Sequence, residues 1–166
     1  HLNTIVVAIK RYADAFEKNE EVVDEPVLKD ARLSMTDRIM GMQWTMKDIL
    51  DQDIARMLGE AEKALSNSEF FRLGDSFRVL ADDSDVTRRV FQNFPKENLY
   101  SSGLAKIKIS VPEQNRADVV SYVTEILHQN GIELIDALFS QDGIVLILKE
   151  DQAPFAYEKL RSEIPR

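Results

Sequence analysis

The residues whose types and spacing could support chemistry are an acidic cluster and two histidines. Asp82-Asp83-Ser84-Asp85 gathers carboxylates as calcium-binding loops do. Such a loop also needs a glycine at its sixth position and a glutamate at its twelfth, and neither follows in register here. We therefore interpret the cluster as the cap of a short helix that runs to about Phe94.

Enzyme chemistry has little basis in the remaining residues. His1 and His128 are the only histidines, and no motif connects them. No glycine-rich phosphate loop, H-E-x-x-H pair, nucleophile elbow or zinc signature occurs. The chain has no cysteine, which removes thiolate nucleophiles, thiolate metal sites and disulfides. We expect no catalysis, no metal and no cofactor, and a solvent-facing His128 in the last turn of a helix.

Composition indicates a soluble globular protein that carries excess negative charge. The 166 residues are 44% hydrophobic and 30% charged, with a formal net charge of −8. That charge argues against a strong phosphate-binding surface on this chain. No apolar run approaches the ~20 residues of a membrane-spanning helix, so we expect a cytoplasmic protein without membrane contact. Because the chain opens with His1 rather than Met, we expect upstream sequence to have been lost.

The order strand, helix, strand, strand, helix is predicted from residue 105 to the end. Apolar residues alternate in the first strand and form one helical face in residues 117–129, and Gly131 can close that helix in the left-handed conformation. Residues 144–149 are apolar on both faces, as in a central or interface strand. A last helix follows Asp151 as its N-cap, over about residues 152–163, with Pro154 in its first turn.

Residues 31–94 predict the same order. A strand at 31–42 precedes a helix at about 45–66, two strands around the Gly74-Asp75 turn and the short helix described above. The sequence is compatible both with a duplicated α+β unit and with a single α+β unit beside an unrelated first half. We expect an N-terminal helix and linker at residues 1–26, a first α/β unit at 27–104 and a second unit at 105–166.

Two features of the first half allow more than one interpretation. The strand at 31–42 has Leu33, Met35 and Ile39 on one side. Its other side carries Arg32, Ser34, Thr36 and Arg38, which is either a solvated or intersubunit face or an anion site. Trp44 and the five methionines are either adaptable core or the lining of a pocket.

The stretch from Asn115 to Leu134 resembles the ACT domain, a ferredoxin-like βαββαβ module that commonly binds amino acids. The family's recurrent stretch is roughly D-x-P-G-x-L-x-x-I-x-x-x-L-x-x-x-G-I-N-I. Val119, Val120, Val123, Leu127 and Gly131-Ile132 match its spacing without a gap. The resemblance implies an α+β, ferredoxin-like fold and a ligand site at Asn115, Arg116, Asp118, Asn130, Gly131, Ile132 and Glu133.

Three departures bear on the ligand. The family's proline and glycine are Ala117 and Asp118 here, and its asparagine after Gly-Ile is Glu133. Asp118 can cap the helix amides itself and would repel a ligand carboxylate. The fourth strand is also missing after the last helix, so a strand from elsewhere in the chain or from a partner fills that edge, or the edge stays covered or open.

The wider layout resembles archaeal predicted regulators of amino-acid metabolism, in which a helix-turn-helix precedes an ACT region. "NTIVVAIKRYADAF" looks like the end of such a recognition helix. The resemblance implies DNA contact only through upstream sequence. We expect a homodimer that senses an amino acid and controls an attached or partner DNA-binding or metabolic function. The alternative is a ligand-free dimerisation module.

Overall fold

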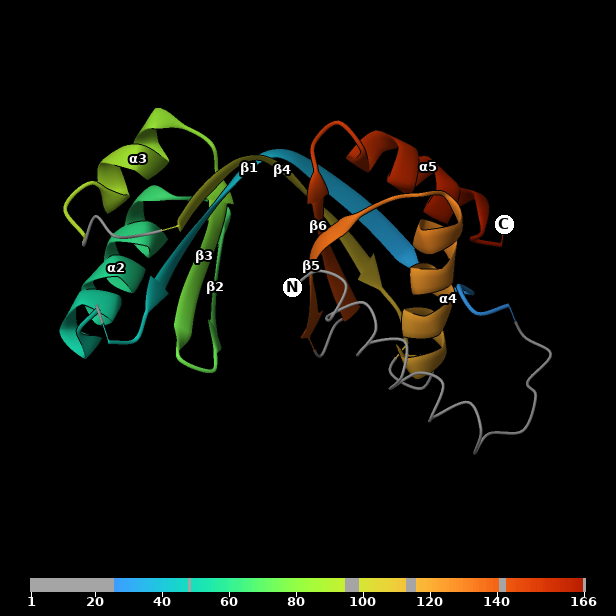
Figure 1. Cartoon of the computed structure of the whole chain (residues 1–166), viewed down its shortest axis with the longest axis horizontal. Helices are drawn as coiled ribbons and strands as arrows, with labels where there is room; N and C mark the ends of the chain where they lie inside the picture. The colour runs from blue at the N-terminus through green and yellow to red at the C-terminus, as the bar shows by residue number, and fades with distance from the viewer. Residues whose placement is uncertain (1–25, 48, 95–98, 113–115, 141–142, 166) are drawn as a thin grey trace. The chain divides into compact units, whose positions relative to one another are not determined.

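The computed structural model describes residues 26–47, 49–94, 99–112, 116–140 and 143–165, and these residues form two compact units (Figure 1). The central unit runs from Arg38 to Leu104. The split unit combines the described residues up to Asp37 with those from Ala105 onward. The helix expected at residues 3–18 lies outside the described residues, and so does all of the expected linker except Pro26. The division into domains at residues 26 and 104 stays a prediction, and residues 27–37 pack with the split unit.

The central unit has the complete βαββαβ order. Its elements are the second part of β1 (Arg32–Thr45), α2 (Asp51–Ala64), β2 (Ser68–Leu73), β3 (Ser76–Asp82), α3 (Asp85–Phe91) and the first part of β4 (Leu99–Ser110). The strands lie in the order β2-β3-β1-β4, and β3 pairs antiparallel with both β1 and β2. This is the ferredoxin-like arrangement.

One face of the central sheet forms a core with α2 and α3. Alternate residues of β1 lie opposite alternate residues of β3 in the pairs Met40↔Ala81, Met42↔Val79 and Trp44↔Phe77, and all of them are buried. Met57 and Ala61 of α2 and Phe91 of α3 complete this core. Of the two interpretations of Trp44, the core is therefore correct. Met35 differs from the other methionines because it is exposed.

The split unit repeats the fold with one strand taken from earlier in the chain. Its elements are the first part of β1, the second part of β4, α4 (Arg116–Gln129), β5 (Leu134–Ser140), β6 (Gly143–Lys149) and α5 (Ala153–Ser162). The strands lie in the order β1-β4-β6-β5, with β5 and β6 antiparallel. In the split unit β4 takes the place of the first strand, β5 of the second, β6 of the third and β1 of the fourth. With the strands counted in this way, both units have the same strand order. The first part of β1 therefore fills the place of the fourth strand that is missing after α5.

The core of the split unit lies between its sheet and the helices α4 and α5, which Figure 1 shows on the same side of β5 and β6. Leu28 and Ala31 enter this core just before β1 begins. Every residue of β6 from Gly143 to Leu148 is buried, as expected for a strand that is apolar on both faces.

A left-handed residue interrupts β1 where the two units meet in sequence. Arg38 has φ 52, and its carbonyl accepts a hydrogen bond from the amide of Asp83 at 2.7 Å. Ile39 and Met40 directly after it are both buried, and from Met40 to Trp44 the even-numbered residues are the buried ones. The prediction that Leu33, Met35 and Ile39 lie on one side of the strand is therefore wrong, because the alternation of side chains does not continue through Arg38.

Three predicted boundaries need correction. α2 begins at Asp51 rather than near residue 45, because β1 continues to Thr45 in its pairing with β3. β4 begins at Leu99, six residues before the predicted start. α5 has Gln152 as its N-cap rather than Asp151, and no side chain caps it, whereas Pro154 does lie in the first turn. Among the described helices, none is long and apolar enough to cross a membrane.

Candidate functional site

The residues of the implied ligand site divide between the two ends of α4. Arg116 is the first residue of the helix, and Asp118 follows in its first turn. Asn115 lies outside the described residues. Asp118 is partly buried. Capping of the first amides by Asp118 stays a prediction.

The other end of α4 is closed by a Schellman motif. Gly131 has φ 65 and donates its amide to the carbonyl of His128 at 3.1 Å, and Ile132 donates to Leu127 at 2.9 Å. Asn130 adds a side-chain bond from Nδ2 to the carbonyl of Ile126 at 2.7 Å. The helix-ending role predicted for Gly131 is confirmed.

Within one chain these two ends do not form a single site. α4 contains 14 residues, which at 1.5 Å per residue separates its ends by about 20 Å. At the far end Gly131 and Glu133 are exposed, whereas Ile132 is buried in the core of the split unit. A small molecule that touches both ends therefore needs residues from a second copy or unit.

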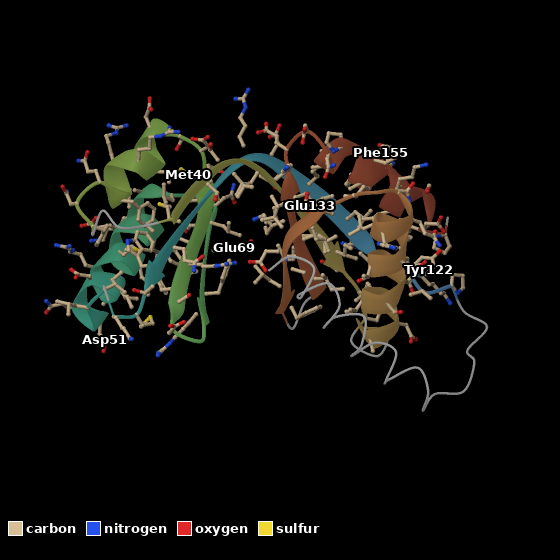
Figure 2. All side chains as sticks on the ribbon, in the orientation of Figure 1. Met40, Asp51, Glu69, Tyr122, Glu133 and Phe155 are labelled. Carbon is tan, nitrogen blue, oxygen red and sulfur yellow. The ribbon has the colours of Figure 1, made fainter. Side chains whose placement is uncertain are left out.

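Glu133 connects the end of α4 to the start of α5. Its amide donates to Oε1 of Gln152, the N-cap residue of α5, at 3.3 Å, while its side chain remains exposed (Figure 2). The backbone of Glu133 is therefore held by a hydrogen bond, whereas its side chain faces solvent. His128, one turn earlier, is exposed as predicted.

Tyr122 and Glu163 join the two helices of the split unit, a contact that the sequence did not indicate. The phenol donates to Oε2 of Glu163 at 2.6 Å. That hydrogen bond, with burial and the nearby negative charge, raises the pKa of Tyr122. The contact ties the middle of α4 to the residue after α5.

An apolar edge lies along β5, which ends the strand order of the split unit. Phe139 is 52% exposed although it faces the same side of the sheet as Ile144, its partner on β6. A shallow recess beside it is lined by Val120, Val123 and Thr124 of α4. Alternating hydrophobicity did predict Phe139 on an apolar face, but its exposure could not be read from the sequence.

The acidic cluster caps a helix and holds an arginine. Ser84 is the N-cap of α3, and its Oγ accepts from the amide of Thr87 at 3.2 Å, as predicted. Asp83 forms an ion pair with Arg88, whose other nitrogen lies 3.8 Å from Asp85. Within the described parts of the chain, no group of three or more His, Cys, Asp or Glu is arranged to hold a metal ion.

The polar strand face is divided by the structure. Arg38 belongs to the central unit, whereas Arg32 belongs to the split unit and lines a cavity with Arg161 of α5. Both Arg32 and Arg38 are exposed, and the two interpretations of this face, a solvated or intersubunit surface and an anion site, stay predictions. Arg161 was not among the residues singled out in the sequence. The spacing of four residues between Tyr157 and Arg161 was the signal in the sequence that these two side chains lie on one helical face.

Comparisons with known proteins support the fold. No family model matches the sequence, and no curated protein matches it. The ligand-free regulatory subunit of aspartate kinase from Thermus thermophilus is similar with a TM-score of 0.59 at 12% identity, over 81% of this chain and 97% of that one.

Complete aspartate kinases contain the same fold in a longer chain. The enzyme from Clostridium acetobutylicum is similar with a TM-score of 0.62 at 8% identity, over 79% of this chain and 33% of that one. For E. coli aspartokinase III in complex with lysine and aspartate the TM-score is 0.58 at 13% identity, over 86% and 34%. This chain thus spans about a third of such kinases and nearly all of the regulatory subunit. Its fold is the α+β, ferredoxin-like fold of ACT-type regulatory domains.

Proposed function

We propose that this chain is an ACT-like regulatory domain that senses an amino acid in the cytoplasm and controls an attached or partner protein, without catalysing a reaction itself. One observation carries the proposal. Two ferredoxin-like units of identical strand order, the second completed by β1, cover nearly the whole of an aspartate kinase regulatory subunit. A complete kinase of this fold has been solved with lysine and aspartate.

The charges at the two ends of α4 favour a cationic effector. Asp118 replaces the glycine at the helix start, and Glu133 presents an exposed carboxylate beyond the helix end. Two carboxylates attract an ammonium or guanidinium group and repel an additional carboxylate. Lysine and arginine are therefore the preferred candidates, with Arg116 as the group for the ligand's own carboxylate.

The site is completed by a second copy. A two-fold axis perpendicular to α4 would place the start of one helix beside the end of its partner's, which brings Asp118 and Glu133 of different copies together. The edge of β5 is a suitable pairing surface because β5 is the last of the described strands in the sheet and carries the exposed Phe139. A ligand between two copies would favour one arrangement of the dimer over another, which is the basis of regulation.

A thermal-shift panel of the twenty amino acids tests the proposal. A ligand at 100 times its dissociation constant stabilises the folded state by about 2.7 kcal/mol. We expect lysine or arginine to raise the melting temperature, and Glu133→Gln to reduce that shift. Glu62→Gln, which changes an exposed carboxylate on α2, is the matched control. If no amino acid at millimolar concentration stabilises the protein, the sensing function is wrong.

A second candidate function is a ligand-free dimerisation module of a transcriptional regulator. The exposed Phe139 on β5, whose outer edge pairs with no other strand among the described residues, favours it, because pairing between copies needs no ligand. A dimer that dissociates with Phe139→Glu but responds to no metabolite supports this alternative. The residues that carry the resemblance to a DNA-binding helix lie outside the described residues, so this route is tested with the full-length protein and DNA.

A further inference from the structure

The split unit contains a cavity of about 820 Å³ that is separate from both ends of α4. Arg32 and Leu33 of β1 line one side. The other side comes from α5 and the residues after it, with Tyr157, Glu158, Arg161 and Ile164. The cavity lies at the edge of the split unit's sheet. Arg32 and Leu33 belong to the part of β1 before Ile39, which does not pair with β3.

The elements on both sides hold the cavity in shape. Leu160 and Ala156 of α5 are buried in the core of the split unit, and Leu28 anchors the chain just before β1. Tyr157 and Arg161 lie four residues apart, so their side chains are neighbours on one face of α5. The two arginines therefore come from separate, fixed elements rather than from one mobile loop.

The cavity combines unused positive charge with an apolar wall. Within the described residues, neither Arg32 nor Arg161 is paired with a carboxylate, in contrast to Arg56 and Arg88. Both guanidinium groups are exposed, whereas Leu33, Tyr157 and Ile164 are partly buried. A guanidinium offers planar, paired donors that match the two oxygens of a carboxylate.

The net charge of the cavity selects the class of anion. Glu158 contributes one negative charge against the two positive ones, and the carbonyl end of α5 adds partial negative charge. A single carboxylate neutralises the net charge of about +1, whereas a dianion such as phosphate would leave a second negative charge unbalanced near Glu158. We propose that this cavity binds a small monocarboxylate with an apolar body, whose carboxylate lies between Arg32 and Arg161 and whose body lies against Leu33 and Ile164.

This proposal goes beyond the sensing of an amino acid at α4 and does not depend on it. Methyl NMR of the full chain with phenylacetate as the probe tests it directly. We expect saturable shifts of the Leu33 and Ile164 methyl signals below about 10 mM, a range in which even a millimolar site fills. Absence of saturation, or shifts confined to residues at the ends of α4, would overturn the proposal.

Charge variants separate specific binding from general attraction. Arg32→Gln and Arg161→Gln should each weaken phenylacetate binding at least about tenfold, as expected for the loss of a charged hydrogen-bonding partner. Lys159→Gln removes the same charge from the same helix, but Lys159 extends over the ring of Phe155 at 5.4 Å, so binding should not change. Equal weakening by Lys159→Gln would show a nonspecific charge effect and contradict the site.

Glu158→Gln provides a change in the opposite direction. Loss of the like charge should strengthen phenylacetate binding several-fold, because two carboxylates repel each other in a partly enclosed cavity. Weaker binding of phenylacetate to this variant, or tighter binding of inorganic phosphate than of phenylacetate to the unmodified protein, would overturn the assignment to a monocarboxylate. All replaced side chains are exposed, and melting temperatures of the variants confirm that each one folds.

Discussion

The phenol of Tyr122 donates a hydrogen bond of 2.6 Å to the carboxylate of Glu163, although the two residues are 41 positions apart. The bond connects α4 with the residue that follows α5, across the helix-covered side of the split unit. The two helices also share one apolar core, so this contact adds a polar tie to a packed pair.

Tyr122→Phe should therefore destabilise the fold slightly, by about 0.5–1 kcal/mol, because the bond is exposed to solvent. Since the folded-state pKa of Tyr122 is raised, this contribution is fully present below the unfolded value of about 10 and is lost as the pH rises through the folded value. Urea unfolding at pH 7 and above pH 10 measures it. Tyr157→Phe is the control, and a difference between Tyr122→Phe and the unmodified protein that grows at high pH would contradict the assignment.

Gly131→Ala and Gly59→Ala should change stability in opposite directions. Gly131 closes α4 with φ 65, where a side chain costs about 1 kcal/mol or more. Gly59 lies inside α2 with open space around its Cβ position, so alanine there should stabilise by up to about 1 kcal/mol. Thermal unfolding of the two variants side by side tests this, and equal signs would mean that the end of α4 is misassigned.

Gly143→Ala should be the most damaging of the glycine substitutions. A Cβ at this position would overlap the carbonyl oxygen of Ile109 in β4, and φ 149 is itself unfavourable for a side chain. Backbone cannot move aside as a flexible side chain can, so we expect a loss of about 3 kcal/mol, at the upper end for an overpacked site. A variant as stable as Gly131→Ala would show that β4 and β6 separate easily at this point.

Ser84→Ala tests the capping interpretation of the acidic cluster. Loss of the Ser84 Oγ acceptor leaves the amide of Thr87 unsatisfied and should cost about 1 kcal/mol. Ser66→Ala, at an exposed position after α2, should have little effect. Calcium should not stabilise the unmodified protein, and a calcium-dependent rise in melting temperature would contradict the assignment of Asp83 to Arg88.

The sequence was most informative where a pattern is local. The strand at residues 144–148, apolar on both faces, and the closure of α4 at Gly131 are both present in the structure, because an apolar run and a left-handed glycine are recognised from near neighbours. The change of face at Arg38 and the irregular register between Leu134 and Asp136 had no such signal, since a residue other than glycine rarely marks a left-handed turn within a strand.

The site was predictable only in part for a related reason. Spacing placed Asp118 and Glu133 at the ends of a helix, and that is where they lie. It could not show that the helix keeps them about 20 Å apart, or that Arg32 would line the same cavity as Arg161, which is 129 positions away. Contacts between residues far apart in the chain depend on how sheets are completed, and here β1 completes a sheet whose other strands follow much later.

That interleaving leads to a prediction about two separate cores. Leu28 is fully buried in the core of the split unit although it precedes Ala105 in the chain, and Met57 is fully buried in the core of the central unit. Leu28→Ala and Met57→Ala should each cost about 2–5 kcal/mol. Hydrogen exchange should then lose protection in α4, β5 and β6 for Leu28→Ala, but in α2, β2 and β3 for Met57→Ala. If Leu28→Ala affected only the residues next to it in sequence, β1 would not be completing the later sheet, and the shared order of the two units would be coincidental.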